Sequence, residues 1–240
     1  MMLNTPTRPA FADPQGVPLT FYVQPIIDLA TDTPIGYEWL TRPRRGGSPL
    51  DLCAWARDTG PLASLEHTVY AAAATHRAHI PARLFLNVDP AMLTDTPLQP
   101  DVWRQLVPVV LEVTEISVPP ILTLQALYAA GLPLAIDDWG TGPGAFDKLA
   151  RWPVEFLKLD RSLLLDARRS VRVRHLLEAV AQFAQAHHIA CIAEGVELAE
   201  EAALVRQLAI PYGQGYFWAR PAPLSDGYWP LPPEPQLSFI

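Results

Sequence analysis

The chain has 240 residues, of which 50% are hydrophobic and 18% are charged, and its formal net charge is −7. A negative net charge excludes a general attraction to DNA or RNA polymers, so any phosphate must be bound through local cations or metal ions. This length and composition are compatible with one large core, as in single-domain α/β barrels.

Short apolar runs typical of strands alternate with longer Ala- and Leu-rich runs of helical period from Thr20 onward. The strand-type runs are TFYVQPII (20–27), IGYEWLT (35–41), RLFLNV (83–88), VVLEVTE (109–115), LPLAIDD (132–138), FLKLD (156–160), IACIAEG (189–195) and GQGYFWA (213–219). The helical runs are SLEHTVYAAAATHRA (64–78), PPILTLQALYAA (119–130), VRHLLEAVAQFAQAH (173–187) and AEEAALVRQL (199–208). This alternation predicts a largely parallel sheet.

We expect an α/β fold of the TIM-like (β/α) barrel type, because seven or eight such strands in one domain favour a closed barrel over an open sheet. The second run follows the first too closely for a helical crossover, so the first two strands are predicted to pair antiparallel. Residues 1–18 are expected to form a flexible arm, residues 19–222 the barrel domain and residues 223–240 a Pro-rich tail. The prolines of the tail are incompatible with a helix or a central strand, which leaves a segment packed across the barrel or a mobile one.

The two cysteines, Cys53 and Cys191, match no metal-binding or redox spacing, and we expect free thiols in a reducing compartment. The first residues lack the apolar run of a secretory signal, and no segment has the uninterrupted apolar length that spans a bilayer. These features predict a cytoplasmic protein without a membrane segment.

Polar side chains stand at or near the carboxyl end of most strand-type runs, where barrel enzymes assemble their active sites. One polar residue at a strand end is commonplace, whereas a series of metal-ligand types on successive strands indicates a functional site. The series comprises Asn87, Glu112, Asp137, Asp138, Lys158, Asp160 and Glu194.

Asp137 and Asp138 are adjacent, although successive side chains of a regular strand point to opposite faces. Gly140 and Gly142 permit a departure from strand geometry, so we expect both carboxylates to reach the barrel mouth. Crowded carboxylates repel one another, and divalent cations such as Mg²⁺ or Mn²⁺ relieve that repulsion. The pattern therefore predicts a two-metal site that promotes displacement at phosphorus, with Lys158 orienting water or neutralising a phosphate oxygen.

Eight short motifs follow one another between about Thr20 and Pro221. They are QPI (24–26), YEWLTR (37–42), LNVDP (86–90), LEVTE (111–115), IDDWGTG (136–142), LKLDRS (157–162), AEGVE (193–197) and GQGYFWARP (213–221). In this order and at this spacing they resemble the EAL-domain cyclic di-GMP phosphodiesterases, with YEWLTR at the Glu-Ala-Leu-x-Arg motif that names the family.

The resemblance implies a metal-dependent enzyme that hydrolyses cyclic di-GMP to the linear dinucleotide pGpG, with two Mg²⁺ or Mn²⁺ ions per site. The implied ligands of the first ion are Glu38, Asn87, Glu112 and Asp137, and those of the second are Asp137, Asp138 and Glu194, partly through water.

The resemblance also implies roles for side chains around the metals. Lys158 would position the attacking water, for which Glu194 is a candidate base, and Gln214 would steady water at the metals. Arg42 would hold a substrate phosphate, for which the guanidinium fork is suited. The implied residues of the nucleotide groove are Gln24, Asp160, Glu197 and Tyr216.

The loop after the Asp pair would be anchored by Glu115, and related domains commonly form homodimers near this loop. The chain departs from the family pattern here, because GPGAF (142–146) replaces a Ser-containing stretch. Trp139 stands where Phe is usual, and Trp39 replaces the Ala of the name-giving motif. By strand alternation, Trp39 should point away from Glu38 toward the helical layer.

Two alternatives stay open. A catalytically silent domain would bind cyclic di-GMP and relay it to a regulatory protein partner, which the altered loop faintly favours. A metal-dependent barrel enzyme could instead act on another phosphodiester. The complete set of implied metal ligands favours the cyclic di-GMP phosphodiesterase.

Overall fold

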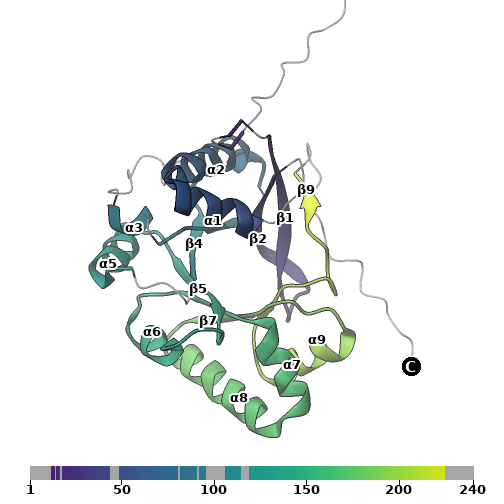
Figure 1. The fold of residues 1–240 in the computed structure, drawn as a ribbon. Coiled ribbons are helices and arrows are strands. Elements are labelled where there is room, and N and C mark those ends of the chain that lie inside the picture. The colour runs from purple at the N-terminus through teal and green to yellow at the C-terminus, as the bar shows by residue number, and fades with distance from the viewer. Residues whose placement is uncertain are drawn as a thin grey trace, which may run out of the picture.

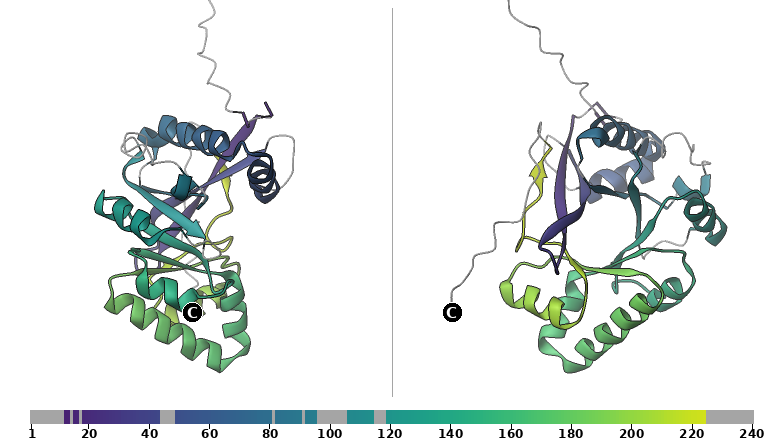
Figure 2. Two further views of the ribbon diagram at one scale, coloured as in Figure 1. Left: turned by 60° about the vertical axis from the view of Figure 1, so that its left-hand side comes forward. Right: turned by 180° about the vertical axis from the view of Figure 1, so that it is seen from behind.

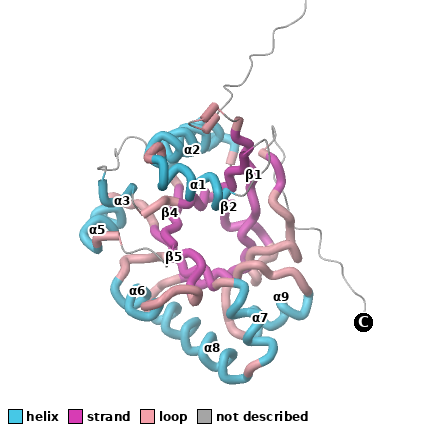
Figure 3. Tube along the Cα trace, viewed as in Figure 1, coloured by secondary structure: helices cyan, strands magenta, loops and turns pink. Residues whose placement is uncertain are grey.

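The computed structural model describes residues 12, 13, 15, 16, 18–43, 49–80, 82–90, 92–95, 106–114 and 119–224. Within this part of the chain, eight strands form a closed barrel, seen as a ring in Figure 3, and a ninth lies beside it. The strands are β1 (Leu19–Asp28), β2 (Thr33–Pro43), β3 (Arg83–Asn87), β4 (Val109–Thr114), β5 (Leu134–Trp139), β6 (Phe156–Leu159), β7 (Ala190–Ala193), β8 (Tyr212–Gly213) and β9 (Ala222–Pro223).

The order of the strands around the barrel is β2-β3-β4-β5-β6-β7-β8-β1, and β1 closes the ring on β2. Pairs from β2 to β8 are parallel, whereas β1 runs antiparallel to both β2 and β8. The hairpin extends from Leu19 opposite Pro43 to Asp28 opposite Thr33. The predicted TIM-like barrel with an early antiparallel pair is therefore confirmed.

Helices surround the barrel on the outside (Figures 1 and 2). The helices are α1 (Pro49–Thr59), α2 (Leu62–His76), the 3₁₀ turn η1 (Arg77–His79), α3 (Met92–Asp95), α5 (Ile121–Ala129), α6 (Ala145–Arg151), α7 (Arg161–Arg169), α8 (Val171–Ala186) and α9 (Ala199–Gln207). The β1–β2 hairpin has no crossover helix, and the short strand β9 pairs antiparallel with β1 at Tyr22 and Val23 (Figure 2). In the described part of the chain, no helix has the length and apolar character needed to cross a membrane.

Inward-facing apolar side chains fill the barrel and form a cluster separate from the larger core between strands and helices. The ring of Phe85 meets that of Phe156 edge-on at 5.1 Å between centroids. Gly36 on β2 leaves room for this layer, because a Cβ atom there would lie 2.6 Å from the Phe85 ring. We call this cluster the apolar layer; it consists of Ile26, Phe85, Val110, Ala135, Phe156 and Ile192.

One local expectation was wrong, and others were incomplete or lie outside the described residues. The run at 213–219 forms only the start of a strand, because Gly215–Trp218 is a turn closed by a hydrogen bond from Trp218 N to Gly215 O at 3.2 Å. The alternation pattern did not reveal α1, α6 and α7. Most of the expected arm and tail, and Glu115, lie outside the described residues, although Ala222 and Pro223 pair with β1.

Trp39 points away from the barrel interior, as the alternation predicted. Its side chain is 2% exposed and belongs to the outer core. It packs against the ring of Phe21 at 5.0 Å and that of His76 at 6.0 Å between centroids. The bulky replacement in the name-giving motif is therefore accommodated between the barrel and α2.

Candidate active site

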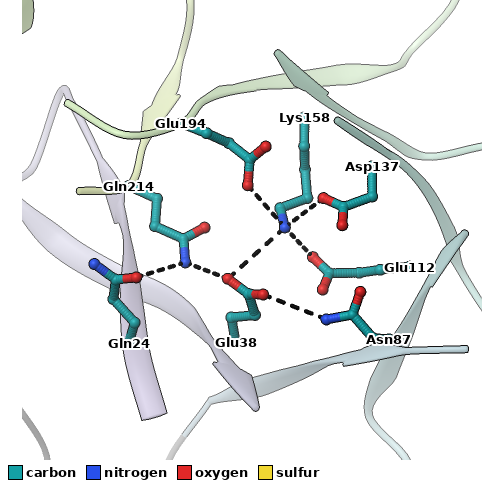
Figure 4. Close-up of polar contacts among 8 residues, drawn as sticks. All are labelled: Gln24, Glu38, Asn87, Glu112, Asp137, Lys158, Glu194 and Gln214. Carbon is teal, nitrogen blue, oxygen red and sulfur yellow. Dashed lines mark hydrogen bonds and ion pairs between the residues drawn. The ribbon is translucent and has the colours of Figure 1, made fainter. Parts of the chain in front are cut away.

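A second layer of inward-facing side chains lies at the carboxyl end of the parallel strands and is polar. Its members on β3 to β6, and Glu194 directly after β7, each follow a member of the apolar layer by two residues, because alternate residues of a strand share a face. We call the eight residues of Figure 4 the polar layer: Gln24, Glu38, Asn87, Glu112, Asp137, Lys158, Glu194 and Gln214.

Lys158 lies at the centre of this layer (Figure 4). Its Nζ atom lies 2.7 Å from Asp137 Oδ1, 2.8 Å from Glu112 Oε1 and 2.9 Å from Glu194 Oε1. Glu38 Oε2 is farther away, at 3.8 Å. These contacts have ion-pair distances without hydrogen-bond angles. The ammonium therefore serves as a shared countercharge for several carboxylates.

Lys158 is fully buried, and burial by itself lowers the pKa of a lysine. The carboxylates of Asp137, Glu112 and Glu194 outweigh that effect and raise the pKa of Lys158 well above its ordinary value. Lys158 is therefore an ammonium at neutral pH.

The acids of the layer carry more negative charge than one ammonium can offset. Burial raises the pKa of Glu112 well above its ordinary value, and Glu38 and Asp137 raise it further against the opposing effect of Lys158. Burial likewise raises the pKa of Glu194. Among the described residues, Glu112 Oε2 is buried without a hydrogen-bond partner. Buried carboxylate oxygens of this kind fit the oxygen ligands that hard divalent cations prefer.

Asp137 and Asp138 both reach the barrel mouth, as expected from the sequence. The pairing of β5 with β6 shifts between Ile136 and Trp139, and Asp138 itself has a φ of 53°. Gly140 also has a positive φ, of 107°. Gly142, which was expected to permit the same departure from strand geometry, does not have a positive φ.

Single ligand atoms of Asp137, Asp138 and Glu194 lie within 4.8 Å of one another, which is a metal-binding arrangement. Burial and the neighbouring Asp137 raise the pKa of Asp138 to about 6. Both observations indicate a place for positive charge beside the Asp pair.

Amide side chains fix the carboxylate of Glu38. Gln214 Nε2 donates to Glu38 Oε2 at 2.5 Å and to Gln24 Oε1 at 3.3 Å. Asn87 Nδ2 lies 3.4 Å from Glu38 Oε1. Gln24 Nε2 donates to the carbonyl of Ala219 at 2.9 Å, so the network connects the layer to the segment before β9.

Two pockets adjoin the polar layer, and Glu38 and Glu194 line both of them. The larger pocket has a volume of about 730 Å³ and includes Arg42, near the end of β2. The smaller pocket, of about 250 Å³, includes Gln24, Glu197 and Tyr216. The site can therefore receive a ligand that extends to both sides of the carboxylates.

Asp160 differs from the other expected groove residues. Its carboxylate accepts a hydrogen bond from the backbone N–H of Ser162 at 2.8 Å and caps the start of α7. Among the described residues, Asp160 belongs to the lining of neither pocket. The structure thus gives Asp160 a role in starting a helix.

Sequence reasoning missed the residues that hold the loop between β7 and α9. Buried Glu201 accepts hydrogen bonds from the backbone N–H groups of Glu197, at 2.8 Å, and Leu198, at 3.2 Å, and it pairs with Arg168 of α7 at 2.9 Å. Arg161, at the start of α7, pairs with Glu197 at 2.9 Å. The helix after the Lys158 strand therefore fixes the loop that follows Glu194. A sequence signal was available, because a Glu at the third position of a helix, as Glu201 is in α9, is typical of a capped helix start.

A polar cluster in the larger pocket was also missed. Arg57 pairs with Asp89, and the hydroxyl of Tyr70 donates to the carboxylate of buried Glu66. Burial, assisted by Asp89, raises the pKa of Glu66 to about 8. Arg57, Glu66 and Asp89 line this pocket together with Cys53. Asp89 stands in the LNVDP motif without an assigned role, and the positions of Arg57 and Glu66 inside helices gave no sequence signal.

Comparison with known proteins agrees with this architecture. The sequence model of the EAL domain family matches residues 15–221. The cyclic di-GMP phosphodiesterase NbdA of Pseudomonas aeruginosa is 38% identical over 102 residues, which cover 42% of this chain and 13% of that protein. RocR of the same species, also named a cyclic di-GMP phosphodiesterase, is 32% identical over 167 residues, which cover 68% of this chain and 41% of that protein.

A solved structure of BlrP1 from Klebsiella pneumoniae, a manganese and cyclic di-GMP complex at pH 9.0, has a TM-score of 0.74 and 27% identity. The similarity covers 93% of this chain and 58% of that chain. The chain spans less than half the length of NbdA and of RocR. Because the family model covers most of the sequence, the chain belongs to the EAL domain family.

Proposed function

We propose that this domain hydrolyses cyclic di-GMP to the linear dinucleotide pGpG with the help of divalent metal ions. The observation that carries the proposal is the convergence of carboxylates from successive strands on Lys158, between two pockets. The names of NbdA and RocR, and the ligands in the BlrP1 complex, support the same chemistry.

The donor set fits two ions of the Mg²⁺ or Mn²⁺ type, because it consists of carboxylate and amide oxygens. Such ions, when bound, stabilise charge on the oxygens at phosphorus and promote ionisation of water. The proposed ligands of the first ion are Glu38, Asn87, Glu112 and Asp137, and those of the second are Asp137, Asp138 and Glu194.

The remaining side chains orient the reactants. The Lys158 ammonium is fixed by ion pairs on several sides, so it can hold a water or a phosphate oxygen without reorganising. Glu194 faces both pockets and is the proposed acceptor of the proton of that water. Gln214 holds Glu38 and steadies water at the metals, while Arg42 on the larger pocket contacts a phosphate oxygen.

The proposed nucleotide groove includes residues of the smaller pocket. Gln24, Glu197 and Tyr216 line it and face the same space as Glu38 and Glu194. Asp160 is the weakest of the proposed groove residues, because its carboxylate is engaged in capping α7.

Incubation of the purified protein with cyclic di-GMP and Mg²⁺ or Mn²⁺, followed by chromatography, tests the function. We expect pGpG as the product, and we expect Glu38→Ala to reduce turnover nearly to zero with the fold intact, because Glu38 is a ligand and not a core contact. Binding of cyclic di-GMP without any product would contradict the proposal and favour a silent receptor. Retention of most of the rate by Glu38→Ala would contradict the assignment of YEWLTR as the name-giving motif.

We also propose a homodimer, formed near the loop after Asp138, that works in the cytoplasm with an unidentified regulatory protein. Phe146 of α6 is 57% exposed beside the ring of Trp139, and Leu122 of α5 is 74% exposed. The cytoplasmic location is supported by the free thiols of Cys53 and Cys191. Sedimentation should show dimers at high concentration, and a monomer with and without cyclic di-GMP would contradict this proposal.

A further inference from the structure

Two arginines of α7 hold the loop that connects β7 to α9 (194–198). The guanidinium of Arg161 donates a hydrogen bond to the carbonyl of Gly195. Arg168 lies about two turns later on the same face of α7 and pairs with Glu201 of α9 at 2.9 Å. Helices α7 and α9 are adjacent in Figure 1. The position of this loop therefore depends on α7 as well as on the strand that it follows.

Helix α7 packs closely against the loop. Gly195 has a φ of 61°, and a Cβ atom there would lie 2.8 Å from the Cβ atom of Arg161. Arg161 begins α7 shortly after Lys158 of β6, whose Nζ atom lies 2.9 Å from Glu194 Oε1. The helix thus joins the strand that carries the ammonium to the loop that carries one of its carboxylate partners.

Glu201 is the residue through which Arg168 acts on this loop. Its carboxylate is 1% exposed and accepts hydrogen bonds from the N–H groups of Glu197, at 2.8 Å, and Leu198, at 3.2 Å. Leu198 is the N-cap residue of α9, and its own side chain makes no capping hydrogen bond. Burial raises the pKa of Glu201, but these hydrogen bonds and the charges of Arg161 and Arg168 outweigh that effect and lower it. A buried carboxylate of this kind needs a countercharge, which Arg168 supplies.

We propose that Arg168 is a positioning residue for the binding of divalent metal ions: through Glu201, it fixes the loop that places the carboxylate of Glu194. The inference rests on the proposed function and deepens it. Contacts behind a metal ligand orient that ligand and thereby set the affinity for the ion. Without Arg168, the buried charge of Glu201 loses its counterion and the loop loosens. The ion must then order Glu194 as it binds, which lowers its affinity.

Titration calorimetry of the purified protein with Mn²⁺, in the absence of cyclic di-GMP, tests this role. Arg168→Ala should weaken Mn²⁺ binding by about tenfold. Arg168→Lys keeps a positive charge beside Glu201 and should recover most of that loss. The matched control is Arg169→Ala, because Arg169 is the exposed next residue of α7 and forms no ion pair in the described part of the chain. This control should bind Mn²⁺ like the wild type.

Two further measurements test the path from Arg168 to the loop. Hydrogen exchange of the Glu197 and Leu198 N–H groups, measured by mass spectrometry without metal, should be about tenfold faster in Arg168→Ala. Glu201→Gln removes the carboxylate charge and should itself weaken Mn²⁺ binding. Adding Arg168→Ala to Glu201→Gln should cause no further loss, because Arg168 acts through that carboxylate.

Three outcomes would overturn the inference. They are wild-type Mn²⁺ affinity in Arg168→Ala, even with a lower unfolding temperature, unchanged hydrogen exchange in that variant, and additive losses in the double variant. The first of these would indicate a merely structural ion pair. Because Mn²⁺ binding is measured without turnover, a wild type that binds Mn²⁺ but produces no pGpG contradicts the proposed activity, while the variants still decide the role of Arg168.

Discussion

The barrel interior contains two adjacent layers whose chemistry is opposite. The apolar layer holds Phe156 and Ile192, and the polar layer holds Lys158 and Glu194 two residues farther along the same strands. Both layers are buried: Ile192 and Lys158 each have 0% exposure. The strand geometry is shared, so the difference lies in how each layer is stabilised.

The apolar layer is stabilised by the removal of its surface from water, a term that does not depend on direction or on ions. The polar layer contains acids that are expensive to bury, and it is stable only with countercharge from Lys158, protons or metal ions. The apolar layer therefore supplies stability, whereas the polar layer is suited to bind positively charged ligands.

Removal of divalent metal ions should have the largest effect on the activity of the polar layer. With excess EDTA we expect no measurable production of pGpG, because several carboxylates would then share the single ammonium of Lys158. Addition of Mn²⁺ in excess over EDTA should restore the rate. Chromatographic detection of full turnover in EDTA would contradict a metal-dependent site.

Lys158→Met should lower turnover about 100- to 1000-fold, because it removes a fixed charge from a buried site and keeps an unbranched chain. Binding of cyclic di-GMP should weaken much less, since the carboxylates and Arg42 are retained. Without metal the variant should also lose about 3–5 kcal/mol of stability through uncompensated carboxylates, and Mn²⁺ should recover part of that loss. Rate measurements and thermal unfolding in EDTA and in Mn²⁺ check both effects.

Equal losses in turnover and in cyclic di-GMP binding would make Lys158 a binding residue. An unchanged rate would exclude it from the reaction altogether.

Glu66 is a buried acid outside the polar layer, and it does not share the ammonium of Lys158. Its folded pKa of about 8 lies above its ordinary value of 4.5, so the folded state binds the proton more tightly. Its contribution to stability is therefore complete below about pH 4.5 and is lost as the pH rises through 8. Glu66→Gln removes this ionisation and should reduce the loss of stability between pH 5 and pH 8.5 by about 4 kcal/mol, since about three pH units separate pH 5 from the folded pKa.

Chemical denaturation of Glu66→Gln at several pH values measures that effect. Glu200→Gln, whose side chain is 69% exposed, is the control and should keep the wild-type pH dependence. A wild-type pH dependence in Glu66→Gln would show that Glu66 does not titrate in this range.

Ile192→Val should have the smallest effect and tests the apolar layer. Deleting one buried methylene should cost about 0.5–1.5 kcal/mol of stability, and the rate should stay within about twofold, because Ile192 has no role in the polar layer. Denaturation midpoints and turnover measured on the same preparation check this separation. A large fall in turnover without a loss of stability would show that the two layers are not independent.

Local sequence features were sufficient to predict the barrel and the residue types at its mouth. The alternation of strand-type and helical runs is a local property, and so is the two-residue period that places Phe156 and Lys158 on one face. The short connection after the first strand predicted the antiparallel pair, which the structure contains. Local pattern therefore predicted the fold and the polar residues at the strand ends, because it acts over neighbouring residues, whereas the ligand role of Glu38 came from the family resemblance.

The way in which the charges of these residues compensate one another depends on the folded barrel. The contacts of Lys158 join side chains from several strands, and Arg168 reaches Glu201 across 33 residues. The turn at Gly215–Trp218 replaced a predicted strand, and it accompanies the contact of Tyr216 with Arg220. Such contacts depend on distances between distant segments after barrel closure, and no local periodicity encodes those distances.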